Sequence, residues 1–156
     1  MRRRRAPKRE TLPDPKYNDV IVEKLINIVI REGKKSIARK IVYDSFEIVK
    51  KRLNEQDVLK ALHQAIENVR PHLEVKPRRI GGATYQVPVE VPNERGVYLA
   101  LRWIRDFARA KKGKPMAESI AEEIISAYKG EGSAVKKRDD THKMAESNRA
   151  FVHFRW

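Results

Sequence analysis

The segment at residues 75–91, which reads VKPRRIGGATYQVPVEV, restricts the fold of this chain more than any other. Its valines, threonine and tyrosine favour extended strands, and Gly81 with Gly82 can adopt the positive φ angles of a tight hairpin turn. Pro77 and Pro88 lack a backbone N–H, so they would disrupt a central strand but are tolerated where every strand is an edge. We therefore expect a two-stranded β-ribbon at about residues 73–91. The alternative is a hairpin folded back onto the helices.

The remainder of the chain has helical periodicity. From Asp19, a good N-cap, a wide apolar face of valine, leucine and isoleucine predicts a mostly buried helix that stops at Gly33. Similar spacing, interrupted by glycine and proline, predicts five more helices at about 36–53, 57–70, 93–110, 115–128 and 134–149. Asn93 is the expected cap of the fourth helix. The predicted fold is mainly α: a bundle of about six helices with a protruding β-hairpin and a flexible basic N-terminal arm.

The charge of the chain is strongly positive, with 35 lysines and arginines against 21 aspartates and glutamates. A net charge of +14 favours a polyanionic partner, either nucleic acid or an acidic membrane surface. Residues 1–16 hold a run of four arginines and three prolines, without apolar periodicity, so we expect a disordered arm that orders on binding. A solvated tail that only aids solubility is the alternative. Residues 17–156 are the size of a single domain.

Several other classes of protein have no support in the sequence. There is no cysteine, so disulfides and thiolate metal sites are excluded, and the four histidines have no ligand spacing. The apolar runs are too short and too charged to span a bilayer, and the N-terminus lacks the apolar part of a signal peptide. We expect a soluble, cytoplasmic protein with no metal, no cofactor, no membrane contact and no small-molecule substrate.

Catalytic patterns are also missing. The sequence GKKS at residues 33–36 resembles the end of a phosphate-binding loop, but Ile28 stands where that motif requires glycine. Glu122 and Glu123, like Asp139 and Asp140, are adjacent, so their side chains diverge on a helix and we expect them on the solvated surface. His63 lies at the edge of an apolar face and is expected to pack there. Enzyme activity is not predicted.

Basic residues form two further clusters on the predicted helices. Tyr98, Arg102, Arg105 and Arg109 are spaced by four, three and four residues, which places them on one face opposite the apolar stripe. Arginine forks suit phosphate oxygens and stack on bases, so this face predicts nucleic-acid binding, and changing its three arginines to alanine should weaken binding without unfolding the protein. Lys34 and Lys35 lie near the positive end of the second helix, which suits a phosphate. For the arginine face the alternative is a solvated surface, and for Lys34 and Lys35 it is an ordinary basic turn.

The ribbon is the third candidate contact. A two-stranded ribbon is marginal alone, so we expect its distal half to gain order from a partner through Arg78, Arg79 and Tyr85.

Four segments together resemble a known family: GKKSIARKIVYDS, AIENVRPHLEVKPRRIGGATYQVPVEV, LALRW and GSAVKKRDDTHKMAESNRAFVHFRW. In this order and spacing they are similar to bacterial ribosomal protein seven of the small subunit, over essentially the whole chain. The resemblance implies a structural, non-catalytic protein of the ribosome that binds the 3′ major domain of 16S ribosomal RNA early and nucleates assembly of the head. It also implies neighbouring head and platform proteins as partners, exit-site tRNA and messenger RNA nearby, and a monomer when free.

The resemblance and the basic patterns together give the residues expected to contact RNA. They lie in the arm, in the turn before the second helix, in the ribbon, on the fourth helix and on the sixth. They are Arg2, Arg3, Arg4, Arg5, Lys8, Arg9, Lys34, Lys35, Lys76, Arg78, Arg79, Gly81, Gly82, Tyr85, Arg102, Arg105, Arg109, Lys136 and Lys137.

Two other functions stay open at this point. A DNA-bending architectural protein could use a proline-containing basic ribbon in a minor groove, but it would need a dimer and would leave the fourth-helix face idle. A protein-interaction adaptor would bind through the ribbon and the terminal aromatic residues, and its binding would be insensitive to salt and nuclease.

Overall fold

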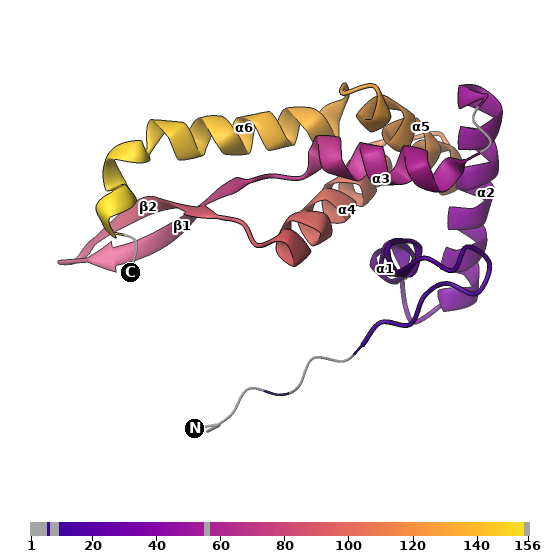
Figure 1. The fold of residues 1–156 in the computed structure, drawn as a ribbon, viewed down its shortest axis with the longest axis horizontal. Helices are drawn as coiled ribbons and strands as arrows, with labels where there is room; N and C mark the ends of the chain where they lie inside the picture. Colours follow the sequence, from indigo (N-terminus) through magenta and orange to yellow (C-terminus); the bar gives the residue numbers. More distant parts are fainter. Residues whose placement is uncertain (1–5, 7–9, 55–56, 155–156) are drawn as a thin grey trace.

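The computed structural model describes residue 6 and residues 10–54 and 57–154, and it has the predicted mainly α fold (Figure 1). The α-helices of this part are α1 (Val20–Val29), α2 (Lys35–Leu53), α3 (Val58–Val69), α4 (Asn93–Ala110), α5 (Met116–Tyr128) and α6 (Ser133–Ser147), followed by the 3₁₀ helix η1 (Arg149–Phe154). The strands are β1 (Leu73–Ile80) and β2 (Ala83–Glu90). Most of the basic arm, including Arg2 to Arg5, Lys8 and Arg9, lies outside the described residues, as does Trp156.

The hydrophobic core lies between the helices, with α5 in contact with α2, α3, α4 and α6. The predicted apolar face of α1 is confirmed, since Val22, Leu25, Ile26 and Val29 are all buried. Residues of α2 to α6 complete the core because each helix presents apolar side chains to the others. Its largest further members are Phe46, Leu62, Ile66, Leu101, Ile104, Ile120 and Ile124. No helix in the described part is long and apolar enough to cross a membrane.

Local signals set some of the helix boundaries. Asp19 caps α1 as predicted, because its Oδ1 accepts hydrogen bonds from the N–H groups of Ile21 and Val22. Two predictions about helix ends were wrong. The helix α1 ends at Val29 and not at Gly33, and Asn93 is the first residue of α4, where its side chain accepts a hydrogen bond from Arg70 instead of capping the helix.

The ribbon is antiparallel and pairs over its whole length, from Leu73 opposite Glu90 to Ile80 opposite Ala83. Gly81 and Gly82 form the turn with φ angles of +56° and +90°, as the sequence predicted. The sheet has only two strands, so both prolines lie in edge strands. The ribbon projects beyond the helical body, but α6 and η1 run along it (Figure 1). It is therefore both a protrusion and a hairpin supported from within the chain.

Candidate nucleic-acid interface

A basic cleft of about 460 Å³ lies where the ends of four helices meet. The C-terminal ends of α1 and α4 and the N-terminal ends of α2 and α5 form its walls, and apolar side chains such as Val29 and Ile41 contribute to its lining. None of the described residues that line it is acidic. Its cationic side chains are Arg31, Lys34, Arg109, Lys111 and Lys114.

The backbone adds to the positive character of this cleft. Neither α2, which begins after Lys34, nor α5, which begins after Pro115, has a side-chain cap at its N-terminus. The first turn of a helix carries N–H groups without partners within the helix, and its dipole places partial positive charge there. Two uncapped helix N-termini beside five cationic side chains suit the oxygens of phosphate groups.

The cations of the cleft also repel one another. Burial lowers the pKa of the Arg109 guanidinium, and the nearby charges of Arg105 and Arg31 lower it further. A bound anion would relieve this repulsion, because it places negative charge among three arginines. The electrostatics of the free protein therefore favour a polyanionic ligand at this place.

Two glutamates hold the lysines on the α5 side of the cleft. Lys111 Nζ lies 2.9 Å from Glu123 and 3.2 Å from Glu122, and Lys114 Nζ lies 2.6 Å from Glu122. Burial lowers the pKa of Lys111, but the hydrogen bonds with Glu123 and Glu122 outweigh it, so the net pKa is raised. The expectation that both glutamates are solvated was wrong for Glu123, which is buried because it pairs with Lys111. Asp139 of the other adjacent pair lies 2.6 Å from Arg138.

The arginine face of α4 divides into an exposed part and a structural part. Arg102 is exposed and lies 3.6 Å from Asp106, one turn further along α4. Arg105 is largely covered, with 19% of its side chain exposed, and it donates to the carbonyl oxygen of Ile28 over 3.3 Å. Arg109 donates to the carbonyl oxygen of Val29 over 2.9 Å. The face is thus partly in contact with the end of α1 and not wholly presented to solvent.

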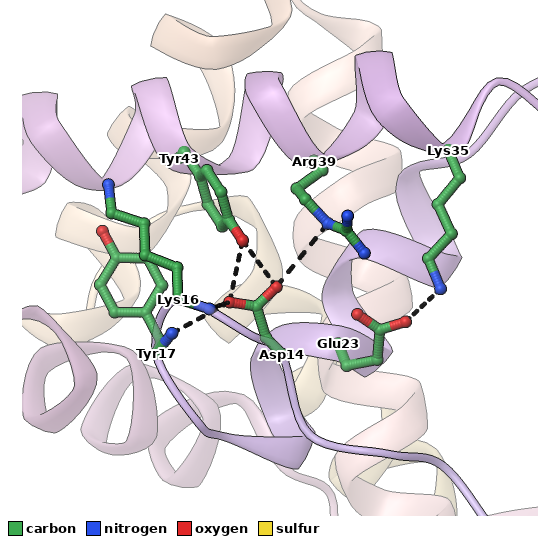
Figure 2. A network of polar contacts seen from close by, with 7 residues as sticks. All are labelled: Asp14, Lys16, Tyr17, Glu23, Lys35, Arg39 and Tyr43. Atoms are coloured by element: carbon green, nitrogen blue, oxygen red, sulfur yellow. Dashed lines mark hydrogen bonds and ion pairs between the residues drawn. The ribbon is translucent and has the colours of Figure 1, made fainter.

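Lys34 and Lys35 point to different places. Lys34 lines the cleft and also pairs with Glu32 over 2.8 Å. Lys35 instead forms an ion pair with the buried Glu23 of α1, so it ties α1 to α2 (Figure 2). Of the two predicted phosphate contacts in this turn, the structure places only Lys34 in the cleft.

The ribbon carries its basic side chains on exposed positions. Lys76, Arg78 and Arg79 are exposed, as are Gly81 and Gly82 at the tip. Tyr85, predicted as a contact group, is half-buried, because its ring packs against Phe151 and Phe154 of η1 with centroid distances of 5.2 and 5.3 Å. The helix η1 therefore packs against this part of the ribbon, and the expectation that a partner orders its distal half stays a prediction.

At the ribbon base, Glu74 joins β1 to α4. Its carboxylate accepts three hydrogen bonds from the guanidinium of Arg95, at 2.8 to 3.0 Å, and lies 3.4 Å from Lys76. Burial raises the pKa of Glu74, but the bonds from Arg95 and then the contact with Lys76 outweigh it, so the net pKa is lowered. This ionised link fixes the direction in which the ribbon leaves the body.

The last predicted pair, Lys136 and Lys137, is exposed on α6 and does not line the cleft. Candidate contacts therefore lie on three surfaces: the cleft with the adjoining α4 face, the ribbon, and α6. A small body with exposed cations on three surfaces is typical of a protein that contacts phosphates of a folded nucleic acid at several points.

Comparison with known proteins decides the class of this protein. The family model described as "Ribosomal protein S7p/S5e" matches residues 1–149. The chain belongs to this ribosomal protein family.

Relatives in the family are similar over their full length. The "Small ribosomal subunit protein uS7" of Thermosipho melanesiensis is 62% identical over 156 residues, and that of Thermotoga neapolitana is 60% identical, with 100% of both chains covered in each case. The protein of the same name from Thermodesulfovibrio yellowstonii is 58% identical over 155 residues, or 99% of each chain.

Members of the S7p/S5e family are structural proteins of the ribosome, a cytoplasmic particle in bacteria, so the prediction of a non-enzymatic ribosomal protein is confirmed.

His63 was expected to pack at the edge of an apolar face. It is exposed instead, and its Nε2 lies 2.7 Å from Oδ2 of Asp19. In the described ranges, no group of three histidine, aspartate or glutamate side chains could hold a metal ion.

Sequence reasoning missed three residues of the cleft in this family member: Arg31, Lys111 and Lys114. The available signal was that the basic turns REGKK, after α1, and KKGK, after α4, both follow the C-terminal end of a helix. Their meeting in one cleft depends on how α1, α2, α4 and α5 pack, which periodicity does not encode.

Proposed function

We propose that this protein is a primary ribosomal RNA-binding protein of the small subunit, and that the basic cleft and the α4 face are its main contact with RNA. The observation that carries this proposal is the convergence of Arg31, Lys34, Arg109, Lys111 and Lys114 at two uncapped helix N-termini. Family membership supplies the ribosomal context.

The proposed mechanism is electrostatic capture followed by docking that selects RNA shape. Each neutralised phosphate releases roughly 0.7 to 0.9 counterions, so an interface with on the order of ten contacts weakens steeply with salt. Double-helical RNA hides its base edges in a deep, narrow groove, so a rigid body selects a junction through its phosphate positions. The cleft supplies such a rigid array because its cations come from the ends of four packed helices.

We further propose the 3′ major domain of 16S ribosomal RNA as the binding site and nucleation of head assembly as the result. The basic N-terminal residues, the exposed ribbon and Lys136 with Lys137 on α6 would extend the contact, and the ribbon tip would approach exit-site tRNA and messenger RNA. Support comes from the protrusion of the ribbon, the exposure of Arg78 and Arg79, and the family resemblance. We propose that the basic residues of the predicted arm before Glu10 gain order on RNA binding, whereas residues 10–16, predicted to be disordered, are described in the structure and include the fully buried Asp14. We also propose one domain at 17–156, a monomer when free, and head and platform proteins as neighbours.

The test is the affinity for a folded junction fragment of the 3′ major domain, compared with scrambled RNA and duplex DNA of equal length, across a salt series. We expect the junction to be preferred by at least about a hundredfold at moderate salt, which corresponds to about 3 kcal/mol. Equal binding of all three ligands would contradict the proposal, and a preference for duplex DNA would favour an architectural DNA-binding protein. Binding of a protein from the subunit without RNA or salt dependence would favour an adaptor.

A further inference from the structure

Asp14 is a fully buried carboxylate in the segment before α1, and its contacts hold its own turn and join that turn to α2 (Figure 2). Its Oδ2 accepts hydrogen bonds from the backbone N–H groups of Lys16 and Tyr17, both over 3.0 Å. The hydroxyl group of Tyr43 on α2 lies 2.8 Å from Oδ1 and 3.0 Å from Oδ2. The Nε of Arg39, also on α2, lies 3.9 Å from Oδ1.

The backbone around Asp14 is fixed as well. The N–H of Asp14 donates to the carbonyl oxygen of Asp19 over 3.1 Å, and the N–H of Asn18 donates to the carbonyl oxygen of Asp14 over 2.7 Å. The ring of Tyr17 meets Tyr43 and Phe46 edge-on, with centroid distances of 5.6 and 5.2 Å. Residues 14–19 are therefore attached to α2 by the Asp14 centre, by the two ring contacts of Tyr17, and by Lys16, whose Nζ lies 3.8 Å from Glu47 and 4.9 Å from the centroid of the Tyr43 ring.

Burying a carboxylate costs free energy that an apolar contact would avoid, unless its donors satisfy it fully. What a carboxylate adds is direction, because it holds donors from its own turn and from α2 in one geometry. The chain before Asp14 then takes a defined course: Glu10 and Thr11 line a groove with Lys24 of α1 and Tyr98 of α4. Asp14 thus determines that the N-terminal segment reaches the Tyr98 end of the α4 face.

We infer that Asp14 is a positioning residue for RNA binding: it fixes the point at which the basic N-terminal residues leave the body, beside Tyr98, so that they and the arginines of α4 meet the same RNA. This inference rests on the proposed function. While the contact with α2 is present, the linker between the basic residues and the body ends at about Glu10. If that contact is lost, the linker extends to Asp19, the N-cap of α1. Effective concentration falls roughly as the −3/2 power of linker length, so we expect about a fourfold loss of RNA affinity.

Two substitutions test the anchor from its two sides. Tyr43→Phe removes one donor from α2 and leaves the N-terminal segment unchanged, whereas Asp14→Asn removes the charge. Asp57→Asn is the matched control, because Asp57 caps α3 through its Oδ1, at an exposed site, and the amide can keep this role. Each variant is made in the full chain and in a chain that starts at Glu10 and so lacks the basic residues.

The first readout needs no RNA. The protein has no cysteine, so Leu12→Cys, at a side chain that is 77% exposed, and Ala110→Cys at the end of α4 can be labelled specifically with a fluorescent pair. We expect a narrow distance distribution in the parent and in Asp57→Asn, and a broad one in Tyr43→Phe and Asp14→Asn. An unchanged distribution in both anchor variants would overturn the inference, whatever the outcome of the junction experiment.

The second readout is the Kd for the junction RNA. We expect Tyr43→Phe and Asp14→Asn to weaken binding about fourfold in the full chain and to have no effect in the chain that starts at Glu10. An equal loss in both chains would overturn the inference, because it would show that Asp14 only stabilises the body. A parent protein that does not distinguish the junction from scrambled RNA would contradict the proposed function, while the distance measurement would still decide whether Asp14 directs the segment.

Discussion

The guanidinium group of Arg109 on α4 donates a hydrogen bond to the carbonyl oxygen of Val29, the last residue of α1, over 2.9 Å. One turn earlier, Arg105 donates to the carbonyl oxygen of Ile28. The helix α1 has no basic residue in its own last turn, so these arginines satisfy its terminal carbonyls and place positive charge at the negative end of its dipole. Two arginines predicted to bind RNA therefore also stabilise the fold.

This relationship separates Arg109 from Arg102 in a mutational experiment. We expect Arg109→Ala to lower the free energy of unfolding by about 1–2 kcal/mol, because a charged hydrogen bond to α1 is lost. Arg102→Ala should change it by less than about 0.5 kcal/mol, because Arg102 is exposed and, among the residues that the structure describes, forms its ion pair with Asp106 alone. Urea unfolding of each variant measures this difference.

Arg109→Ala and Arg102→Ala should both weaken binding of the junction RNA. Each should also make the affinity less dependent on salt, by the amount expected for the loss of about one phosphate contact. The sequence alone predicted that alanine at all three arginine positions would leave the fold intact, and the contacts of Arg105 and Arg109 now predict a less stable protein. If Arg102→Ala destabilises the protein as much as Arg109→Ala does, this division of roles is incorrect.

Lys111 and Lys114 should differ in the same way on the other side of the cleft. Lys111→Ala leaves the buried carboxylate of Glu123 without its cation, and we expect a loss of about 2 kcal/mol of unfolding free energy. Lys114→Ala removes an ion pair with Glu122 from a half-exposed side chain, and the loss should be below about 1 kcal/mol. Thermal unfolding at one pH compares the two variants. In the Glu123→Gln background Lys111→Ala should lower the free energy of unfolding by less, because no buried charge is left without its cation.

His142 should make the protein less stable in mild acid. Its Nε2 accepts a hydrogen bond from the backbone N–H of His72 over 3.0 Å, which requires an unprotonated nitrogen. Burial lowers the pKa of His142 below its ordinary 6.5, and the charges of Arg138 and His72 lower it further, against a smaller opposite effect of Asp139. The unfolded chain therefore takes up a proton at a higher pH than the folded protein does, so stability is greatest above pH 6.5 and falls as the pH decreases below it.

The size of this effect is about 1.4 kcal/mol for each unit by which the two pKa values differ. His142→Gln should flatten the pH dependence of the urea midpoint, while the same change at the exposed His153 should leave it unchanged. A wild-type midpoint that is constant across this range would contradict the prediction.

The C-terminal 3₁₀ helix should stabilise the ribbon through Tyr85. Phe151 and Phe154 both contact its ring, and aromatic pairs contribute about 0.5–1.5 kcal/mol beyond the area that they bury. A double-mutant cycle with Tyr85→Leu and Phe151→Leu should give a coupling free energy of about 1 kcal/mol. Amide hydrogen exchange in β2 should become faster in either single variant, with little change in α5, whereas equal acceleration in α5 would indicate general destabilisation.

Much of this fold follows from short-range signals. Asp19 was recognised as an N-cap because its side chain bonds to N–H groups only two and three residues away. The ribbon was recognised because Gly81 and Gly82 permit its turn and its two prolines allow only edge strands. The end of α1 was misplaced, because the groups that donate to its last carbonyl oxygens belong to α4 and lie about 80 positions away in the chain.

By itself, therefore, the sequence determined the helices, the strands and turn of the ribbon, the excess of positive charge and the family resemblance, because each depends on neighbouring residues or on composition. Only the tertiary structure decided which cations meet. It placed Arg31 and Lys34 beside Arg109, Lys111 and Lys114, turned Lys35 toward Glu23, and buried Asp14 against Tyr43. The physical reason is that these contacts arise when the apolar stripes of α1, α2, α4 and α5 pack together, and no local pattern specifies which helix ends that packing brings side by side.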